Sequence, residues 1–466
     1  MNIRRYIYPY AAALLTGMVA VSCASESAEA PDNGLPAPVG ISITAAPLGV
    51  STRGFADEEL IEDPASSSEL INNWIVFFTQ GNQVISYEEG GSTTGVWNDR
   101  VQTELPRGRY TVLAFANMDN AKLKNYFKDG LPEDWKNPAK WKNLINEEKN
   151  GAAIADLSRF SEFSYNSQNS DNSPLIPMSG YREINVTQTV NETFSIEVVR
   201  MLAKVQFAFK NESQTPVSIE KIEFQPVYDG DIYLFPEEGN GDNRFVEGVY
   251  PDPQNYGMRT IAPALSLPNF NDTARSTFYI KESAAKGNHP TDHFHIGISL
   301  KRGDDETENA TYALASDELQ TILRNDYVLF PVVISDYIPR LEVYDYPPIG
   351  GYPVQVESNG NEFYATFSSS GAFDIEAKLV NSAGETVVVS EKRSDTDTEY
   401  VECIISDQLQ KELSLTYDPI EEMWHGDFKK GANPNAPIIL TFKFHIGNLI
   451  YTRSLHLLST KMNGNN

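Results

Sequence analysis

Histidine and carboxylate side chains that could bind a metal gather at one place in the sequence. His289, Asp292, His293 and His295 lie within "HPTDHFHIG", and on a strand His293 and His295 would point to one face. A stable zinc site needs a third and a fourth ligand at compatible geometry, and the sequence does not single them out. Ordinary polar positions on an exposed strand are the preferred interpretation, so we expect no metal and no cofactor.

The sequence contains no residue pattern typical of an enzyme. It lacks a G-x-S-x-G elbow, a P-loop and a dinucleotide fingerprint after a strand. Carboxylates are so abundant, at 64 Asp and Glu, that a glycosidase-like pair has meaning only with geometry. Trp97 and Trp424 could be sugar platforms, but turn or edge positions are the preferred interpretation. We predict that the protein is not an enzyme.

Cys23 ends a leader that is typical of exported proteins. Arg4 and Arg5 precede "YAAALLTGMVAV", an apolar run too short to span a bilayer stably. Ser22 and Cys23 then resemble a bacterial lipoprotein signal, in which the cysteine is acylated; an ordinary secretory leader is the alternative. We expect residues 1–22 to be a signal peptide and residues 23–37 a disordered leash. The lipid would hold the protein to a membrane. The acidic residues behind Cys23 resemble the signal by which some Gram-negative lipoproteins reach the surface of the outer membrane.

Arg53, followed by Gly54, has no obvious partner nearby in the sequence. In "STRGFADEEL" they stand between an alternating apolar run and a string of carboxylates. The composition favours coil, where a protease can reach the chain. Taken alone, Arg53 is interpreted as a solvated linker residue, and a site of proteolytic processing is the alternative.

The run before Arg53, "VGISITAAPL", is predicted to be a half-buried strand. Val39, Ile41, Ile43 and Ala45 share one face because side chains alternate along a strand. Burying each of the three larger side chains would contribute roughly 1.5–3 kcal/mol. We expect an edge or near-edge strand that covers an apolar groove. Its loss would expose unpaired backbone groups, which are a template for a strand from another chain.

The remaining pattern predicts an all-β fold. Alternating runs rich in Val, Ile, Tyr and Phe recur along the chain, among them "NWIVFF", "AKVQFAFKN", "YVLFPVVIS" and "IILTFKFHI". We expect β-sandwiches at residues 38–198, 199–338 and 345–466, with a helical insertion near 118–149. The last boundary is placed at "SDYIPRLEVYDYPPIGGYP", where Pro347, Pro348, Gly350 and Gly351 indicate a linker.

Charge and cysteine content limit the partners. The formal net charge is −27, and such a surface repels nucleic acid, so we expect no nucleic-acid partner. The chain has two cysteines, Cys23 and Cys403. If Cys23 is acylated, no internal disulfide can form, and apolar cores must provide the stability.

Several local sequences together resemble the fimbrillin family, the subunits of lipoprotein-derived pili. Cys23 and Arg53 occupy the expected places, and four further matches follow in order over residues 1–338: "IPMSG" (176–180), "VVRMLAKV" (198–205), "FYIKE" (278–282) and "LRNDYVLFPVVIS" (323–335). The resemblance implies two tandem transthyretin-like Greek-key β-sandwiches. It further implies that an arginine-directed protease cuts between Arg53 and Gly54 and that the first strand, which carries Val39, Ile41, Ile43 and Ala45, is displaceable. A strand from a neighbouring subunit then adds to the sheet.

The C-terminal third departs from this resemblance. A stalk subunit would end in a donated strand, whereas this chain continues through about 120 residues of β pattern. We therefore expect a tip or minor pilus subunit whose extra sandwich faces outward, toward a protein or glycan on a host or bacterial surface. An anchor that keeps its lipid, with Arg53 uncut, is one alternative. A glycan-binding surface lipoprotein is the other.

Overall fold

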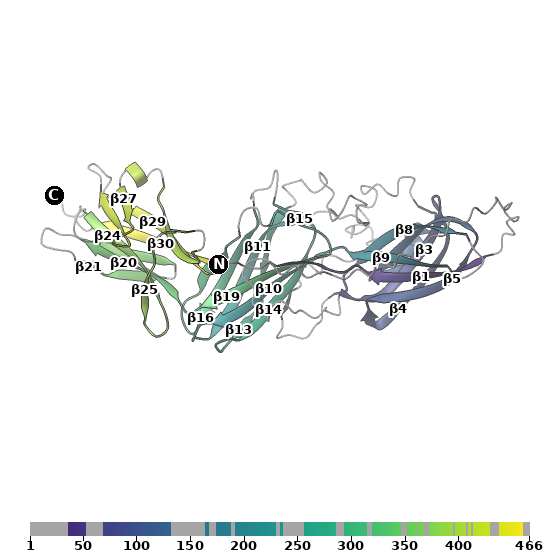
Figure 1. Cartoon of the computed structure of the whole chain (residues 1–466), viewed down its shortest axis with the longest axis horizontal. Coiled ribbons are helices and arrows are strands. Elements are labelled where there is room, and N and C mark those ends of the chain that lie inside the picture. Colours follow the sequence, from purple (N-terminus) through teal and green to yellow (C-terminus); the bar gives the residue numbers. More distant parts are fainter. Residues whose placement is uncertain are drawn as a thin grey trace, which may run out of the picture.

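The protein is described by a computed structural model in which strands predominate. The described residues are 36–52, 69–131, 164–166, 174–187, 192–229, 234–235, 256–285, 293–314, 319–345, 352–359, 361–367, 372–394, 397–406, 409–411, 413–428 and 438–459. The strands form three groups along the long axis of an elongated molecule (Figure 1). The all-β class is confirmed, while the number of independent domains stays a prediction.

The N-terminal group is built on a seven-stranded sheet. In spatial order its strands are β4 (Gln83–Val96), β3 (Ile71–Gln80), β6 (Gly108–Ala116), β8 (Met178–Val186), β9 (Glu192–Arg200), β1 (Ala37–Ala45) and β5 (Asn98–Leu105). β8 and β9 pair at Met178–Arg200 and Ser179–Val199, at one end of each strand. The sheet therefore folds there into two layers, with β9, β1 and β5 facing the other four strands across one apolar core.

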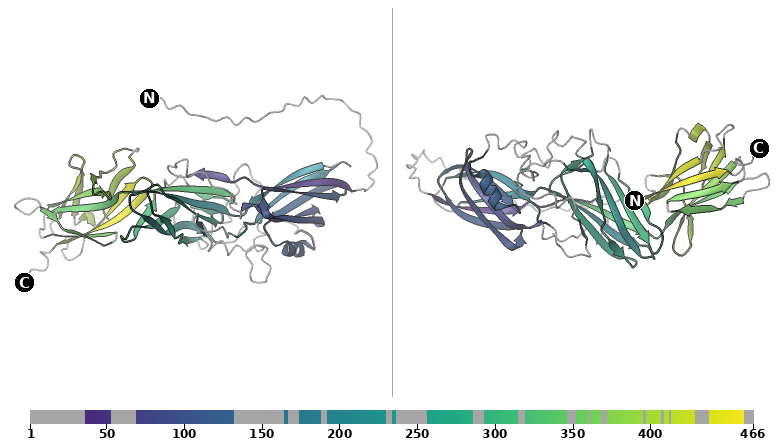
Figure 2. Two further views of the ribbon diagram at one scale, coloured as in Figure 1. Left: turned by 90° about the horizontal axis from the view of Figure 1, so that it is seen from below. Right: turned by 180° about the vertical axis from the view of Figure 1, so that it is seen from behind.

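A helix covers the outer face of this sheet. α2 (Asn120–Phe127) begins at Asp119, whose side chain caps Lys122 N–H at 3.0 Å. Its buried Leu123 and Phe127 pack on Phe77 and Phe115 of β3 and β6, and Figure 2 shows the helix outside the strands. The helix lies in the segment 118–149 where an insertion was expected; residues 132–149 are outside the described ranges.

The middle group is a two-layer sandwich. One layer has the order β2 (Gly49–Thr52), β19 (Asp326–Ser335), β10 (Ala203–Glu212), β14 (Thr273–Ile280) and β7 (Ser164–Asn166). The other layer contains β12 (Tyr256–Ile261), β11 (Val217–Tyr228), β16 (His295–Arg302) and β17 (Glu308–Tyr312), with β13 (Leu265–Leu267) beside β11. β15 (Ser283–Ala284) pairs with β18 (Thr321–Ile322). Buried rings from both layers meet in the core, with Phe207 and Phe330 stacked 5.0 Å apart and Phe224 beside them.

The C-terminal group has two layers of its own. One contains β21 (Tyr352–Val354), β20 (Ile338–Asp345), β24 (Ala372–Val380), β28 (Met423–Phe428), β27 (Leu413–Asp418) and β25 (Thr386–Val388). The other contains β26 (Glu399–Ile404), β29 (Ile438–Ile446), β30 (Leu449–Ser459), β23 (Glu362–Phe367) and β22 (Val356–Asn359), and the short 3-10 helix η5 (Leu409–Lys411) precedes β27. β20 lies within the stretch interpreted as a linker, yet it pairs with β24 along its whole length.

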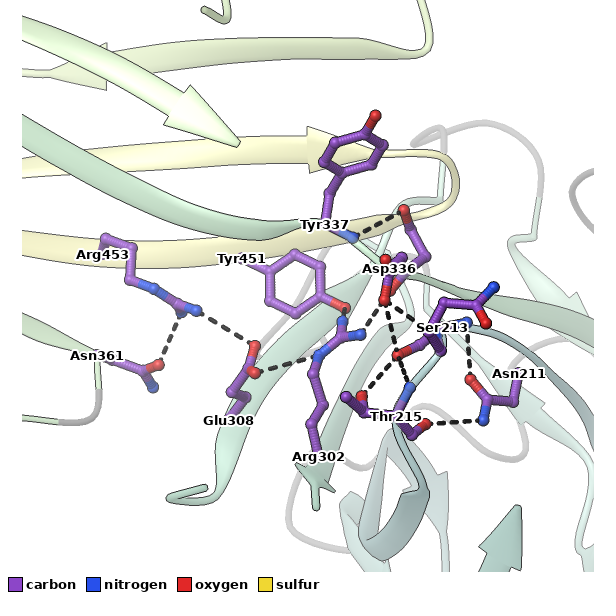
Figure 3. A network of polar contacts seen from close by, with 12 residues as sticks. Asn211, Ser213, Thr215, Arg302, Glu308, Asp336, Tyr337, Asn361, Tyr451 and Arg453 are labelled. Atoms are coloured by element: carbon purple, nitrogen blue, oxygen red, sulfur yellow. Dashed lines mark hydrogen bonds and ion pairs between the residues drawn. The ribbon is translucent and has the colours of Figure 1, made fainter. Parts of the chain in front are cut away.

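The middle and C-terminal groups share one sheet and one core. β17 pairs with β30 from Ala310–Tyr451 to Tyr312–Leu449, so the ten-stranded sheet continues from one group into the other. Beside this pairing, Arg302 Nε lies 3.2 Å and Arg453 Nη2 3.4 Å from the carboxylate of Glu308 (Figure 3). Arg302 also donates to the hydroxyl of Tyr451 at 3.3 Å. These contacts join the two groups into a continuous body.

Asp336 makes a second polar connection between the two groups. Its carboxylate accepts hydrogen bonds from Gln214 N–H at 3.0 Å and from the Ser382 hydroxyl at 2.7 Å. Burial raises the pKa of Asp336, but the hydrogen bonds from Gln214, Ser382 and Ser213 outweigh it and hold the pKa below its ordinary value. The chain thus leaves the middle group at a fixed point (Figure 3).

We expect Glu308→Gln to destabilise this connection. The substitution would leave two buried guanidinium groups, of Arg302 and Arg453, without their shared carboxylate. Breaking such a buried pair costs about 3–5 kcal/mol, to be measured as the free energy of unfolding in urea. Glu306→Gln, at an exposed position two residues away, is the matched control. Equal stability of the two variants would contradict the structural role of Glu308.

Candidate functional site

β1 occupies a slot inside the N-terminal sheet. It pairs in parallel with β9 from Val39–Glu192 to Ala45–Val198, and antiparallel with β5 from Ala37–Leu105 to Thr44–Asn98. The side chains of Val39, Ile41, Ile43 and Ala45 all point into the core and are 0–4% exposed. β5 is the edge strand, so β1 lies one position in from the edge, and its removal would leave an apolar slot between β9 and β5.

The connections of β1 make it separable from its neighbours. β5 follows β4 and β9 follows β8 in the chain, so neither neighbour is joined to β1 by a hairpin turn. After Ala45 the chain runs through residues 46–48 into β2. β1 is therefore held in its slot by backbone pairing and side-chain burial, and one covalent connection leads from it to the rest of the fold.

β2 places the next residues on the middle group. It pairs in parallel with β19 from Asp326–Gly49 to Leu329–Thr52 and is the edge strand of the five-stranded sheet. Between the two strands, Leu48 packs on Ala208, Tyr327 and Leu329. Residues 37–52, which we call the N-terminal segment, thus lie across both groups (Figure 2).

Arg200 holds the turn of the N-terminal segment between β1 and β2. Arg200 is 1% exposed. Nη1 donates to the carbonyl oxygen of Ala46 at 2.6 Å and to Oδ1 of Asn325 at 2.8 Å. Nη2 donates to the carbonyl oxygen of Glu69 at 2.8 Å. Asn325 Nδ2 in turn donates to the carbonyl oxygen of Pro47 at 2.6 Å.

A buried ion pair adjoins this arginine. The Glu69 carboxylate lies 2.8 Å from Lys204 Nζ and accepts a hydrogen bond from the Tyr279 hydroxyl at 3.0 Å. Burial lowers the pKa of Arg200, and the negative charge of Glu69 opposes this. Arginine stays protonated in proteins, so the buried charge of Arg200 depends on the oxygens of Ala46, Asn325 and Glu69 that accept its hydrogen bonds. We call Arg200, Glu69, Lys204, Tyr279 and Asn325 the crossover cluster.

The crossover cluster binds the chain on both sides of residues 53–68. Ala46 and Pro47 are bound on the upstream side and Glu69 on the downstream side. Arg53 and Gly54 lie within residues 53–68, outside the described part of the chain. A cut between them would separate the N-terminal segment covalently from the fold without touching the cluster.

The sequence of this framework matches a known family. The model of the family described as Mfa2, "Fimbrillin-A associated anchor proteins Mfa1 and Mfa2", matches residues 73–343. The chain belongs to the Mfa2 family. The match covers more than half of the chain and ends within β20, the first strand of the C-terminal group. No curated protein matches the sequence.

Two solved structures show what this Mfa2-family chain is similar to. The fimbrilin FimA of Porphyromonas gingivalis W83 is 12% identical, with a TM-score of 0.31 over 91% of this chain and 98% of that one. A candidate cell adhesion protein of Parabacteroides distasonis ATCC 8503 is 12% identical, with a TM-score of 0.35 over 66% and 88%. TM-scores this low support no argument, so the family assignment rests on the family match.

The residues singled out in the sequence differ in what the structure shows of them. Cys23, like Arg53 and Gly54, lies outside the described residues, and all three assignments stay predictions. Trp424 is buried against Tyr417 and Phe442, so it is no exposed sugar platform.

Trp97 is exposed, and the Cζ atom of Arg200 lies over its ring, 5.2 Å from the ring centre of Trp97. Its carbonyl oxygen accepts a hydrogen bond from Ala45 N–H at 2.9 Å, so this tryptophan belongs to the site. Within the ranges given above, no three His, Cys, Asp or Glu side chains gather where they could hold a metal ion. In the same ranges no helix is long and apolar enough to span a membrane.

Sequence reasoning missed the crossover cluster. Arg200 and Lys204 both lie in "VVRMLAKV" and Asn325 lies in "LRNDY", which the resemblance used without a role for these side chains. A signal was present, because two cations within an apolar run that joins two groups of strands must find buried partners. The partners themselves, Glu69 and the carbonyl oxygens of Ala46 and Pro47, are far away in the sequence.

Proposed function

We propose that this Mfa2-family chain is a structural and adhesive subunit of a cell-surface pilus rather than an enzyme. In this proposal its N-terminal segment occupies a place that an extended segment of another subunit takes during assembly. The observation that supports it is the topology of β1, which is paired on both edges and yet joined by a turn to neither neighbour. Cutting between Arg53 and Gly54 would convert this strand into a bound peptide.

The vacated slot would favour strand addition. Removing β1 would uncover the backbone groups of β9 and β5 together with the pockets of Val39, Ile41 and Ile43. Unpaired strand edges accept foreign strands, because main-chain hydrogen bonds supply affinity and side-chain pockets supply specificity. The exchange would therefore conserve the interactions that β1 now makes.

The pairing of β30 supports a position at the end of the pilus, as a tip or minor subunit. β30 pairs with β29 on one edge and with β17 and β23 on the other. A strand that is paired on both edges is not available for donation to a neighbour. The subunit would thus accept a strand at its N-terminal and middle groups, while its C-terminal group faces outward toward a protein or glycan ligand on another surface.

A membrane anchor is the second candidate function. The description of the matching family names anchor proteins, and an anchor would keep the lipid on Cys23 with Arg53 uncut. The N-terminal segment would then remain in its slot as a permanent part of the fold. In both cases we propose that the precursor is a lipoprotein of the outer membrane.

The N-terminal residue of the protein recovered from cells distinguishes the two. A mature protein that begins at Gly54 supports the strand-accepting subunit, and one that begins at acylated Cys23 supports the anchor. We expect Cys23→Ser to move the precursor from the membrane fraction to the soluble fraction, because the acyl chains supply the membrane affinity; Cys403→Ser is the matched control. Unchanged fractionation with detergent for Cys23→Ser would contradict the lipoprotein assignment.

A further inference from the structure

The turn between β1 and β2 is bound in a different way from the strands on either side of it. β1 and β2 are held by backbone ladders, whereas the carbonyl oxygens of Ala46 and Pro47 are bound by side chains. Their donors are Arg200 Nη1 at 2.6 Å and Asn325 Nδ2 at 2.6 Å. Arg200 and Asn325 are also bonded to each other at 2.8 Å, so they act as one unit.

This pair is built into the protein independently of the N-terminal segment. Arg200 ends β9, where its other terminal nitrogen is fixed by the carbonyl oxygen of Glu69. Asn325 directly precedes β19, and its own N–H donates to the carbonyl oxygen of Leu202 at 3.0 Å. Its φ of 64° lies in the left-handed region, which asparagine tolerates well. Both donors would therefore stay in position if Ala46 and Pro47 left.

We propose that Arg200 and Asn325 form a site that binds main-chain carbonyl oxygens and fixes the register of any extended segment lying across the N-terminal and middle groups. In the intact chain the occupant is Ala46–Pro47. After exchange, the occupant is the main chain of a second pilus subunit; this part rests on the proposed function. A buried donor without an acceptor is costly, and most so when it is charged. A segment that supplies both carbonyls is therefore favoured over one that ends within the β1 slot.

The surroundings of the turn define the chemistry of the occupant. Ala46 is fully buried, its N–H donates to the carbonyl oxygen of Val198 at 2.9 Å, and Leu48 packs on apolar side chains of the middle group. The matching segment would have alternating apolar residues, then a small residue at the position of Ala46, and an apolar residue two positions later.

The test uses the full-length protein cut at Arg53–Gly54 and two fluorescent, C-terminally amidated peptides. One comprises residues 37–45 and fills the β1 slot. The other comprises residues 37–47 and adds the two carbonyls. Each competes with the bound N-terminal segment, and the equilibrium uptake gives a ratio of affinities. We expect the longer peptide to bind about tenfold to hundredfold more tightly, the range for hydrogen bonds to a buried charged donor.

Arg200→Met should reduce this ratio toward one, because methionine fills similar space without donors. Because both peptides are measured on the same variant, their ratio cancels any general loss of stability. Arg200→Lys is used if Arg200→Met does not fold. Lysine has one nitrogen in place of the guanidinium fork, so this variant should give an intermediate ratio. A ratio near one in wild type, or an unchanged ratio in the Arg200 variants, would overturn the carbonyl site while strand exchange stands. Failure of both peptides to enter the cut wild-type protein would overturn the strand exchange itself.

Discussion

Arg53→Ala is expected to leave the N-terminal segment attached and to abolish incorporation of the subunit into pili. Without the cut, residues 37–52 remain covalently joined to the fold, and any dissociated segment returns to its slot at high effective concentration. An incoming strand from another subunit would then compete against an intramolecular partner. We expect pilus-associated protein to fall by at least tenfold, measured by quantitative immunoblotting of sheared pili.

Arg53→Lys is the matched variant for this experiment. It keeps the positive charge but should resist an arginine-specific protease, so it separates the role of cleavage from the role of charge. We expect Arg53→Lys to behave as Arg53→Ala does in cells, and to be cut at this position by trypsin in vitro. The processing hypothesis is wrong if Arg53→Ala protein enters pili as well as wild type does, and the anchor function then becomes the better explanation.

The strand β1 shows what a sequence pattern can and cannot predict. The alternation of Val39, Ile41 and Ile43 is sufficient to predict a half-buried strand, because the side-chain period of two fixes which residues share a face. It does not specify the neighbours. The parallel partner β9 lies about 150 residues away in the chain, and many other alternating runs could pair with β1 equally well.

The crossover cluster was beyond prediction for a different reason. A lone arginine is almost always exposed, and Arg200 is buried because its guanidinium finds oxygens of Ala46, Glu69 and Asn325. These three come from segments that are far apart in the sequence and that the folded structure brings together. The charge is visible in the sequence, but its partners depend on the tertiary structure.

The strand β20 lies within the stretch that the sequence pattern led us to interpret as a linker. Leu341 and Val343 alternate with polar residues and are buried, which is an ordinary strand pattern. The nearby Pro347, Pro348, Gly350 and Gly351 favoured a linker instead. Pro339 is tolerated because it lies at the second position of the strand, near its start. Asp336, which accepts hydrogen bonds from both groups, lies shortly before β20, where the chain passes from the middle group to the C-terminal group.

Ile41→Ala is expected to loosen the N-terminal segment after the cut by a large factor. Ile41 is 1% exposed at the centre of β1 and lies in the core between the two layers. Truncating a buried isoleucine to alanine costs about 2–5 kcal/mol, and each 1.4 kcal/mol is about a tenfold change in an equilibrium constant. If the loss appears in the dissociation rate, the cut segment should leave about thirtyfold to a few thousandfold faster.

The rate can be followed with a fluorophore on the N-terminal segment, after limited digestion with an arginine-specific protease. Ser42→Ala is the matched control, because Ser42 is the next residue of the same strand and faces the other side of the sheet. It should change the release rate little. The wild-type segment should stay bound for a measurable time, since Val39, Ile41 and Ile43 remain buried after the cut. Two results would contradict this prediction: release of the wild-type segment at the moment of cleavage, or equal release rates for Ile41→Ala and Ser42→Ala. Either result would show that burial of this face does not hold the strand. Assembly could not then depend on an incoming segment that competes for the same pockets.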